Sequence, residues 1–102
     1  MRVTLVGILA VIVISLIGCS RQDSLRSTDQ EATALYKNRC ISCHAVDRSG
    51  RNGPDLRDIA SRMTQQQVMD IIQDGSQGMP SYKNRMANKE IEILAEWLVK
   101  SK

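Results

Sequence analysis

The stretch RCISCHAVD, residues 39–47, sets Cys40 and Cys43 three residues apart and places His44 directly after the second cysteine. The chain has 102 residues with three cysteines and one histidine, so two of its cysteines and its only imidazole fall within five consecutive positions. Thiols three residues apart lie on the same side of a helical turn. This stretch therefore predicts one site that uses both thiols and the imidazole together.

The spacing CxxCH is the attachment pattern of c-type haem. Cys40 and Cys43 can form thioethers with the two vinyl groups of the ring, and the Nε2 atom of His44 can then ligate the iron. We therefore predict one haem c, covalently attached through Cys40 and Cys43.

Three alternatives compete with haem at these residues. A thioredoxin-like redox pair would need a βαβ setting, and the sequence shows no strand pattern. A structural zinc ion needs four ligands, whereas this stretch offers three local candidates and the chain has no second histidine. The third alternative is a lipoprotein without haem, in which Cys40 and Cys43 form a disulfide or bind another metal.

The first 18 residues, MRVTLVGILAVIVISLIG, predict an export signal. Their apolar run covers about 24 Å at 1.5 Å per residue, which is short for a bilayer core of about 30 Å. An uncleaved membrane anchor is the alternative interpretation. Because c-type haem is attached outside the cytoplasm, an export signal in the same chain favours haem at Cys40 and Cys43.

The tetrapeptide LIGC, which ends at Cys19, resembles the lipobox at which bacterial lipoproteins are cut and acylated. We predict lipidation of Cys19, a polar tether over residues 19–27, and a location on the extracytoplasmic face of the cell membrane. The tether and Thr28 could reach about 30 Å when fully extended. The alternative is plain secretory cleavage, with Cys19 left as a free or disulfide-bonded thiol.

Charge and aromatic content limit the partners and the core. Without Arg2, the 14 basic residues become 13 against 11 acidic residues, a net charge too small to predict nucleic-acid binding. The aromatic residues are Tyr36, Tyr82 and Trp97, with no phenylalanine. A domain of this size commonly needs a metal, disulfides or another supplement to its core.

Capping signals and apolar spacing predict an all-α domain over residues 28–102. Thr28 and Glu31 form a capping box that predicts a helix over residues 29–39. Glycine and proline predict a loop over 47–55, and apolar residues at helical spacing follow within 56–63.

The second half of the domain shows the same kind of signals. Thr64 and Gln67 form a second capping box, for a helix that should stop at Gly75. A loop over 75–87 follows, and Asn88 can cap a last helix. The apolar stripe of that helix comprises Ile91, Leu94, Ala95 and Leu98.

The sequence resembles the class I c-type cytochromes, and most of all the small membrane-anchored bacterial lipoproteins of the cytochrome c-551 type. The resemblance covers residues 28–102 and rests on CxxCH, on NGPDL at 52–56 and on GMP at 78–80. It implies a small all-α fold with several helices packed around one covalently bound haem. It also implies that the first helix crosses the last closely, with Ala32 and Tyr36 against Leu94 and Trp97.

The resemblance assigns roles to two further residues. The carbonyl of Pro54 would accept a hydrogen bond from Nδ1 of His44. Met79, between Gly78 and Pro80, matches the position of the sixth iron ligand, and Met86 is the reserve candidate. Met63 and Met69 sit at apolar helix positions, where methionine more often fills a core.

A haem would also complete the core, because it is a large apolar plate. The residues that we expect to pack against it are Leu35, Leu56, Ile59, Val68, Ile72, Met79, Leu94 and Leu98. An exposed haem edge would lie near Ala45, Val46, Gln77, Gly78 and Ser81. A basic flank that could steer an acidic partner comprises Arg48, Arg51, Lys83, Arg85 and Lys89.

The function that the resemblance implies is that of a monomeric one-electron carrier, not an enzyme. Its partners would be a quinol-oxidising membrane complex, as donor, and a terminal cytochrome c oxidase of a bacterial respiratory chain, as acceptor. A thioether opposite imidazole favours ferrous iron and fills the sixth position. The alternative function is a haem enzyme or gas sensor whose sixth iron position is open.

Overall fold

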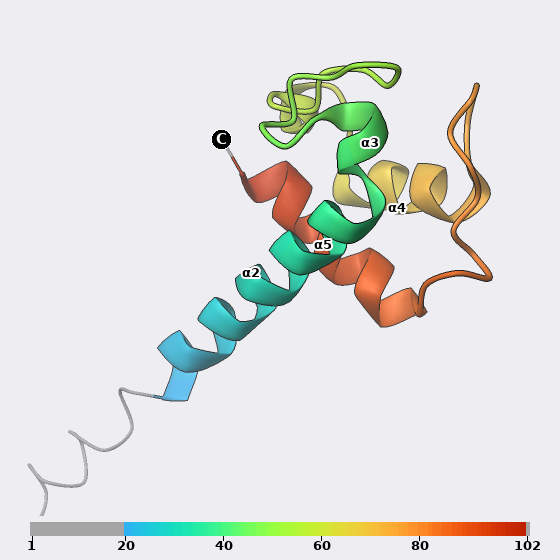
Figure 1. Ribbon diagram of the computed structural model, residues 1–102. Coiled ribbons are helices and arrows are strands. Elements are labelled where there is room, and N and C mark those ends of the chain that lie inside the picture. Colours follow the sequence, from blue (N-terminus) through green and yellow to red (C-terminus); the bar gives the residue numbers. More distant parts are fainter. Residues whose placement is uncertain (1–19, 102) are drawn as a thin grey trace, which may run out of the picture.

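The computed structural model describes residues 20–101, which form helices joined by loops (Figure 1). The elements, in chain order, are α2 (Ser20–Arg39), α3 (Ile41–His44), the 3-10 helix η1 (Ile59–Ser61), α4 (Gln65–Asp74) and α5 (Asn88–Lys100). Within this described part, strand pairing is limited to an isolated bridge between Ser76 and Met79. The all-α class is therefore confirmed.

Two sequence predictions fall on residues beyond this range. The predicted signal peptide, residues 1–18, and the predicted lipidation site, Cys19, lie outside the described residues. Over residues 20–101, no helix combines the length and the apolar character needed to cross a bilayer.

Helices α2 and α5 cross in the middle of the domain (Figure 1). Ala32 is fully buried, and its small side chain lets the two helices approach closely. The rings of Tyr36 and Trp97 meet with centroids 5.5 Å apart and an interplanar angle of 47°. Leu94 is buried in the same core cluster as Tyr36. The predicted crossing of the first and last helices of the domain is confirmed.

The start of the first helix was predicted wrongly. Helix α2 begins at Ser20 and not at Asp29, so residues 20–27, expected to be a polar tether without helical structure, are helical. Thr28 is not a cap, because its hydroxyl donates to the carbonyl oxygens of Ser24 and Leu25 inside the helix. A threonine inside a helix bonds backwards in this way. The segment also contains no glycine or proline that would end a helix.

The caps of α4 agree with the sequence, whereas the cap of α5 differs by one residue. The Thr64 hydroxyl accepts from the Gln67 N–H at 3.2 Å, and the Gln67 side chain accepts from the Thr64 N–H at 2.9 Å. Helix α4 ends at Asp74, and its C-cap is Gly75, whose φ of 77° favours glycine. At α5 the cap is Ala87 and not Asn88, because the Glu90 carboxylate accepts from the Ala87 N–H at 2.9 Å.

The apolar residues in 56–63 form less helix than their spacing predicted. Only Ile59–Ser61 is helical, as a 3-10 turn, and Ala60 is exposed. The Asp55 carboxylate accepts from the Arg57 N–H at 2.8 Å, and such a side-chain bond competes with a helix start. The segment nevertheless buries Ile59 in the core.

Arg48 joins the loop after α3 to α5. Its guanidinium lies 5.3 Å from the ring centroid of Trp97 and donates to the Ser101 carbonyl at 3.1 Å. A cation stacked on an indole is stabilising, by roughly 0.5–1 kcal/mol at a partly exposed site. Arg48 therefore has a structural contact within the domain, and its place in the predicted docking flank stays a prediction.

Candidate haem site

The short helix α3 and its N-cap residue, Cys40, present Cys40, Cys43 and His44 to one cavity. The Cys40 carbonyl accepts from the N–H groups of Cys43 at 3.3 Å and of His44 at 2.9 Å, which closes a single helical turn. Both thiols are half-buried, and His44 is 7% exposed. The turn therefore places the two thiols and the imidazole as the spacing CxxCH predicted.

The loop that follows α3 folds back over it. The Cys43 carbonyl accepts from the N–H groups of Arg51 at 2.9 Å and of Gly53 at 2.8 Å, while the His44 carbonyl accepts from Gly50 at 2.9 Å. These bonds satisfy carbonyls at the end of a helix, which otherwise lack partners. The loop is thereby held against the imidazole.

Gly53 lies directly against the ring of His44. A Cβ atom at this position would lie 2.7 Å from Cε1, 2.9 Å from Nδ1 and 3.0 Å from Nε2 of the imidazole. Ordinary contacts between such atoms are about 3.5–4.0 Å. Only glycine therefore permits the observed approach of the loop to the ring.

The orientation of the imidazole follows from one hydrogen bond. The Nδ1 atom of His44 lies 2.9 Å from the carbonyl oxygen of Pro54, the contact that the cytochrome resemblance implies. A carbonyl oxygen can only accept, so Nδ1 carries a proton, and in the neutral imidazole the lone pair is then on Nε2. A histidine in this tautomer is prepared to bind a metal through Nε2.

The cavity has a volume of about 500 Å³, within the range of cofactor sites. Cys40, Cys43, His44, Pro54 and Met79 all line it. Much of the remaining wall is apolar and comprises Leu56, Ile59, Val68, Ile71, Ile72, Leu94 and Leu98. A large apolar wall with two thiols and an oriented imidazole fits the chemistry of haem c. Of the residues expected against the ring, Leu35 packs on the core and is not part of this wall.

Met79 reaches the cavity from the loop between α4 and α5. The Met79 N–H donates to the Ser76 carbonyl at 2.5 Å, and the Ser76 N–H donates to the Met79 carbonyl at 3.2 Å. A Cβ atom on Gly75 would lie 2.7 Å from the Met79 carbonyl oxygen, so glycine is needed at this turn. The backbone of Met79 is thus held in a narrow loop at the cavity.

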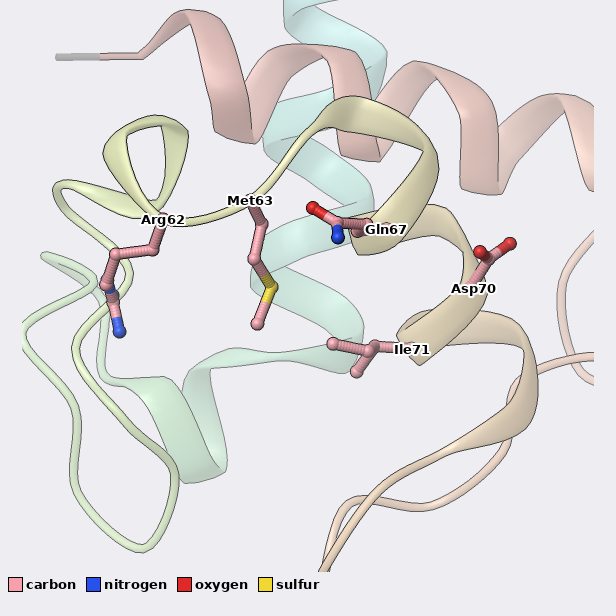
Figure 2. A pocket seen from close by; sticks show the side chains of 5 residues that line it. All are labelled: Arg62, Met63, Gln67, Asp70 and Ile71. Atoms are coloured by element: carbon pink, nitrogen blue, oxygen red, sulfur yellow. The ribbon is translucent and has the colours of Figure 1, made fainter.

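The other methionines divide into two groups. Met86, the reserve ligand, is buried in the core cluster and does not line the cavity. Met69 packs against the same cluster. Met63, expected to be core filler, lines the cavity, and Figure 2 shows it extending with Ile71 into the shallow pocket beside α4. Two methionines, Met63 and Met79, can therefore reach the space.

The pKa of the Cys40 thiol is not that of a reactive redox cysteine. Burial, followed by the charge of neighbouring Cys43, raises the pKa of Cys40 to about 11. Reactive CxxC motifs have lowered thiol pKa values. Within residues 20–101, no group of three or more histidine, cysteine and acidic side chains is arranged to hold a metal ion.

The structure adds residues to the cavity that the sequence prediction omitted, among them Arg39, Ile71 and Tyr82. Tyr82 follows Met79 by three residues, and it is one of only two tyrosines in the chain. At the expected haem edge, Gln77 and Gly78 line the cavity and Val46 is 68% exposed. Ala45 is 8% exposed and does not line the cavity, so its place near the haem edge stays a prediction.

The sequence of this chain is similar to those of known cytochromes. Residues 27–98 match the family described as cytochrome C oxidase, cbb3-type, subunit III. Cytochrome c-551 of Bacillus subtilis is 30% identical over 76 residues, which cover 74% of this chain and 66% of that protein. Cytochrome c-551 of Pseudomonas aeruginosa is 30% identical over 83 residues, covering 72% of this chain and 79% of the relative.

A solved structure shares the fold. The crystal structure of cytochrome c6C from Synechococcus sp. PCC 7002 superposes with a TM-score of 0.60 at 14% identity. The superposition covers 69% of this chain and 92% of that one. At this identity the likeness concerns the arrangement of the helices.

Proposed function

The chain belongs to the class I c-type cytochromes, a family with covalently bound haem c, and from this we propose that Cys40 and Cys43 carry the haem while His44 and Met79 ligate its iron. Haem-based electron transfer is the activity of this family. When bound, haem c supplies an iron that gains and loses one electron.

The observation that carries this proposal is the convergence of five residues on one cavity. Cys40 caps α3, Cys43 and His44 belong to it, Pro54 comes from the loop that follows, and Met79 comes from the loop before α5. The Pro54 carbonyl fixes the imidazole and raises the basicity of its Nε2 atom. As an iron ligand, the thioether of Met79 would stabilise the ferrous state, since sulfur is a soft ligand.

Met79 is favoured over Met63 by its loop. Its backbone is fixed by two hydrogen bonds with Ser76 and by the close approach of Gly75, so the side chain starts from a defined position. If His44 and Met79 both held the iron, it would gain and lose an electron without exchanging ligands. This supports a carrier and not an enzyme or gas sensor with an open iron position.

The optical spectrum of the ferric protein tests the ligation. Sulfur-bound ferric iron gives a weak band in the red, which should be present in the wild type and lost in Met79→Ala. Met63→Ala is the matched control, because it removes a methionine from the same cavity and should retain the band. Rapid carbon monoxide binding by the unmutated ferrous protein would instead support the open-site alternative.

Covalent attachment has its own test. A haem-stained denaturing gel should show a coloured band for the wild type and none for a Cys40→Ala/Cys43→Ala double variant. A colourless wild type would support the alternative of a lipoprotein without haem, in which the two thiols form a disulfide or bind another metal.

We further propose a place for the carrier in a bacterial respiratory chain. It takes electrons from a quinol-oxidising membrane complex and passes them to a terminal cytochrome c oxidase, while lipidated Cys19 holds it on the extracytoplasmic face of the cell membrane. The family description, which names an oxidase subunit, supports the oxidase side. The purified holoprotein should accelerate quinol-driven oxygen uptake by membranes that contain both complexes.

The basic flank gives the docking part of this proposal. Arg51, Lys83 and Arg85 are exposed and take part in none of the ion pairs of residues 20–101, whereas Lys89 pairs with Glu92 at 3.1 Å. Replacing these three cations by glutamine should slow oxygen uptake at low salt more than at high salt, because salt screens exposed charges.

A further inference from the structure

The loop that carries Met79 is attached to the rest of the domain at two places, and one of them is a single tyrosine. On the α4 side, the Ile72 carbonyl accepts from the Tyr82 N–H at 2.9 Å and the Gln73 carbonyl accepts from the Lys83 N–H at 3.2 Å. The Ser81 hydroxyl also donates to Gln73, at 2.5 Å. These carbonyls belong to the last turn of α4 and would otherwise lack partners.

The second attachment is the phenol of Tyr82. Its hydroxyl donates to the carbonyl oxygen of Arg39 at 3.0 Å, across 43 positions of sequence. Arg39 is the last residue of α2 and directly precedes Cys40. Among the hydrogen bonds of the described residues, this one alone joins the 75–87 loop to the end of α2.

The position of the Tyr82 ring makes this bond relevant to the cavity. The ring is half-buried and lines the cavity together with Arg39, Cys40 and Met79. The bond therefore connects the segment that presents the thioether to the segment that presents the first thiol. Without it, the loop would keep its anchors on α4 but lose its connection to the opposite wall.

We infer that Tyr82 is a positioning residue that clasps the Met79 loop to the end of α2 and so keeps the thioether in reach of the iron. This inference rests on the proposed ligation by Met79. The hydrogen bond between Tyr82 and Arg39, here called the clasp, positions only Met79 among the proposed iron ligands. Its loss should therefore favour competing ligands at the sixth iron position with little effect on the fold.

Displacement of methionine by imidazole from ferric holoprotein measures this effect directly. The change is Tyr82→Phe, which keeps the ring and removes only the hydroxyl. The loss of the red band is the signal that reports imidazole binding. Guanidinium unfolding of the same samples gives the global stability. A hydrogen bond is worth about 1 kcal/mol, so the apparent Kd for imidazole should fall about five-fold.

Tyr36→Phe is the matched control, because the Tyr36 hydroxyl makes the same kind of bond, to the Ala45 carbonyl at 2.7 Å, away from the Met79 loop. Its imidazole Kd should stay within about two-fold of the wild type, although its stability falls by about 1 kcal/mol. Ser81→Ala, which removes one of the three hydrogen bonds on the α4 side, should act in the same direction as Tyr82→Phe.

The outcomes separate this inference from the proposed function. A wild type that shows the red band, with equal imidazole Kd values for Tyr82→Phe and wild type, would overturn the clasp alone. Equal shifts in Tyr82→Phe and Tyr36→Phe would also overturn it, because imidazole binding would then follow general stability. A wild type without the red band would overturn ligation by Met79, and the clasp with it.

Discussion

Replacing Gly53 by alanine tests how tightly the loop after α3 holds the imidazole. The new Cβ atom would lie 2.7–3.0 Å from three ring atoms of His44, so either the ring or the loop must move. Movement of the loop would lengthen the 2.9 Å bond between Nδ1 and the Pro54 carbonyl. The substitution therefore disturbs both the packing of residue 53 against the His44 ring and the hydrogen bond between His44 and Pro54.

The expected cost follows from these two effects. Overpacking costs about 1–3 kcal/mol, and a lost hydrogen bond adds about 1 kcal/mol. The reduced freedom of the unfolded chain offsets about 0.4–1 kcal/mol. We expect the free energy of unfolding to fall by about 1–3.5 kcal/mol, centred on about 2 kcal/mol, from a total of about 4–12 kcal/mol for a domain of this size.

Guanidinium unfolding of the ferric holoprotein, followed by far-ultraviolet circular dichroism and by haem absorbance, measures this cost. The midpoint should fall by about 1 M. Gly78→Ala is the control: a Cβ atom there meets nothing within 4 Å, but the φ of 85° makes alanine strained by about 1 kcal/mol. If Gly53→Ala is no more destabilising than Gly78→Ala, the ring is not held by this contact.

Four further predictions concern the core, the α4 cap, alkaline pH and the anchor. Leu94→Ala removes a side chain that is 1% exposed where α2 and α5 cross, and denaturant unfolding should show a loss of about 2–5 kcal/mol. Thr64→Ala removes the α4 cap and should cost about 1 kcal/mol by the same assay; no loss would contradict the capping role. Burial raises the pKa of Tyr36 to about 12, so the folded state holds this proton more tightly than the unfolded chain, and stability should decline between pH 10 and 12, with a smaller decline in Tyr36→Phe. Cys19→Ser should release the protein from membranes on fractionation, whereas retention would favour an uncleaved anchor.

The parts of the fold that the sequence predicted well are those set by short-range chemistry. Thr64 and Gln67 satisfy each other's backbone groups, so the start of α4 depends on four residues alone. The same signal failed at Thr28, because the preceding residues are also helical and the hydroxyl turned back to Ser24 and Leu25. A capping pattern identifies a possible helix start, but it does not show whether the residues before it are also helical.

The candidate site divides in the same way. Cys40, Cys43 and His44 are neighbours in sequence, so their spacing alone predicts that they act together. The contact between His44 and Pro54 came from family resemblance and not from the residues themselves. Tyr82 and Met63 were missed as cavity residues, because their places depend on how the loops around α4 return to the cavity. No local pattern encodes the bond of Tyr82 to Arg39 across 43 positions.

The helical form of residues 20–27 limits the distance from the membrane that the domain of an anchored carrier could reach. As an unstructured chain, residues 20–27 would be a flexible tether. As the first turns of α2, they rise only 1.5 Å per residue, or about 12 Å over eight residues. With a lipid on Cys19, this rigid helix would restrict the haem to a narrow range of distances from the bilayer surface. Donor and acceptor would need their docking faces at the same height, and lateral diffusion in the membrane would set how often the carrier meets them.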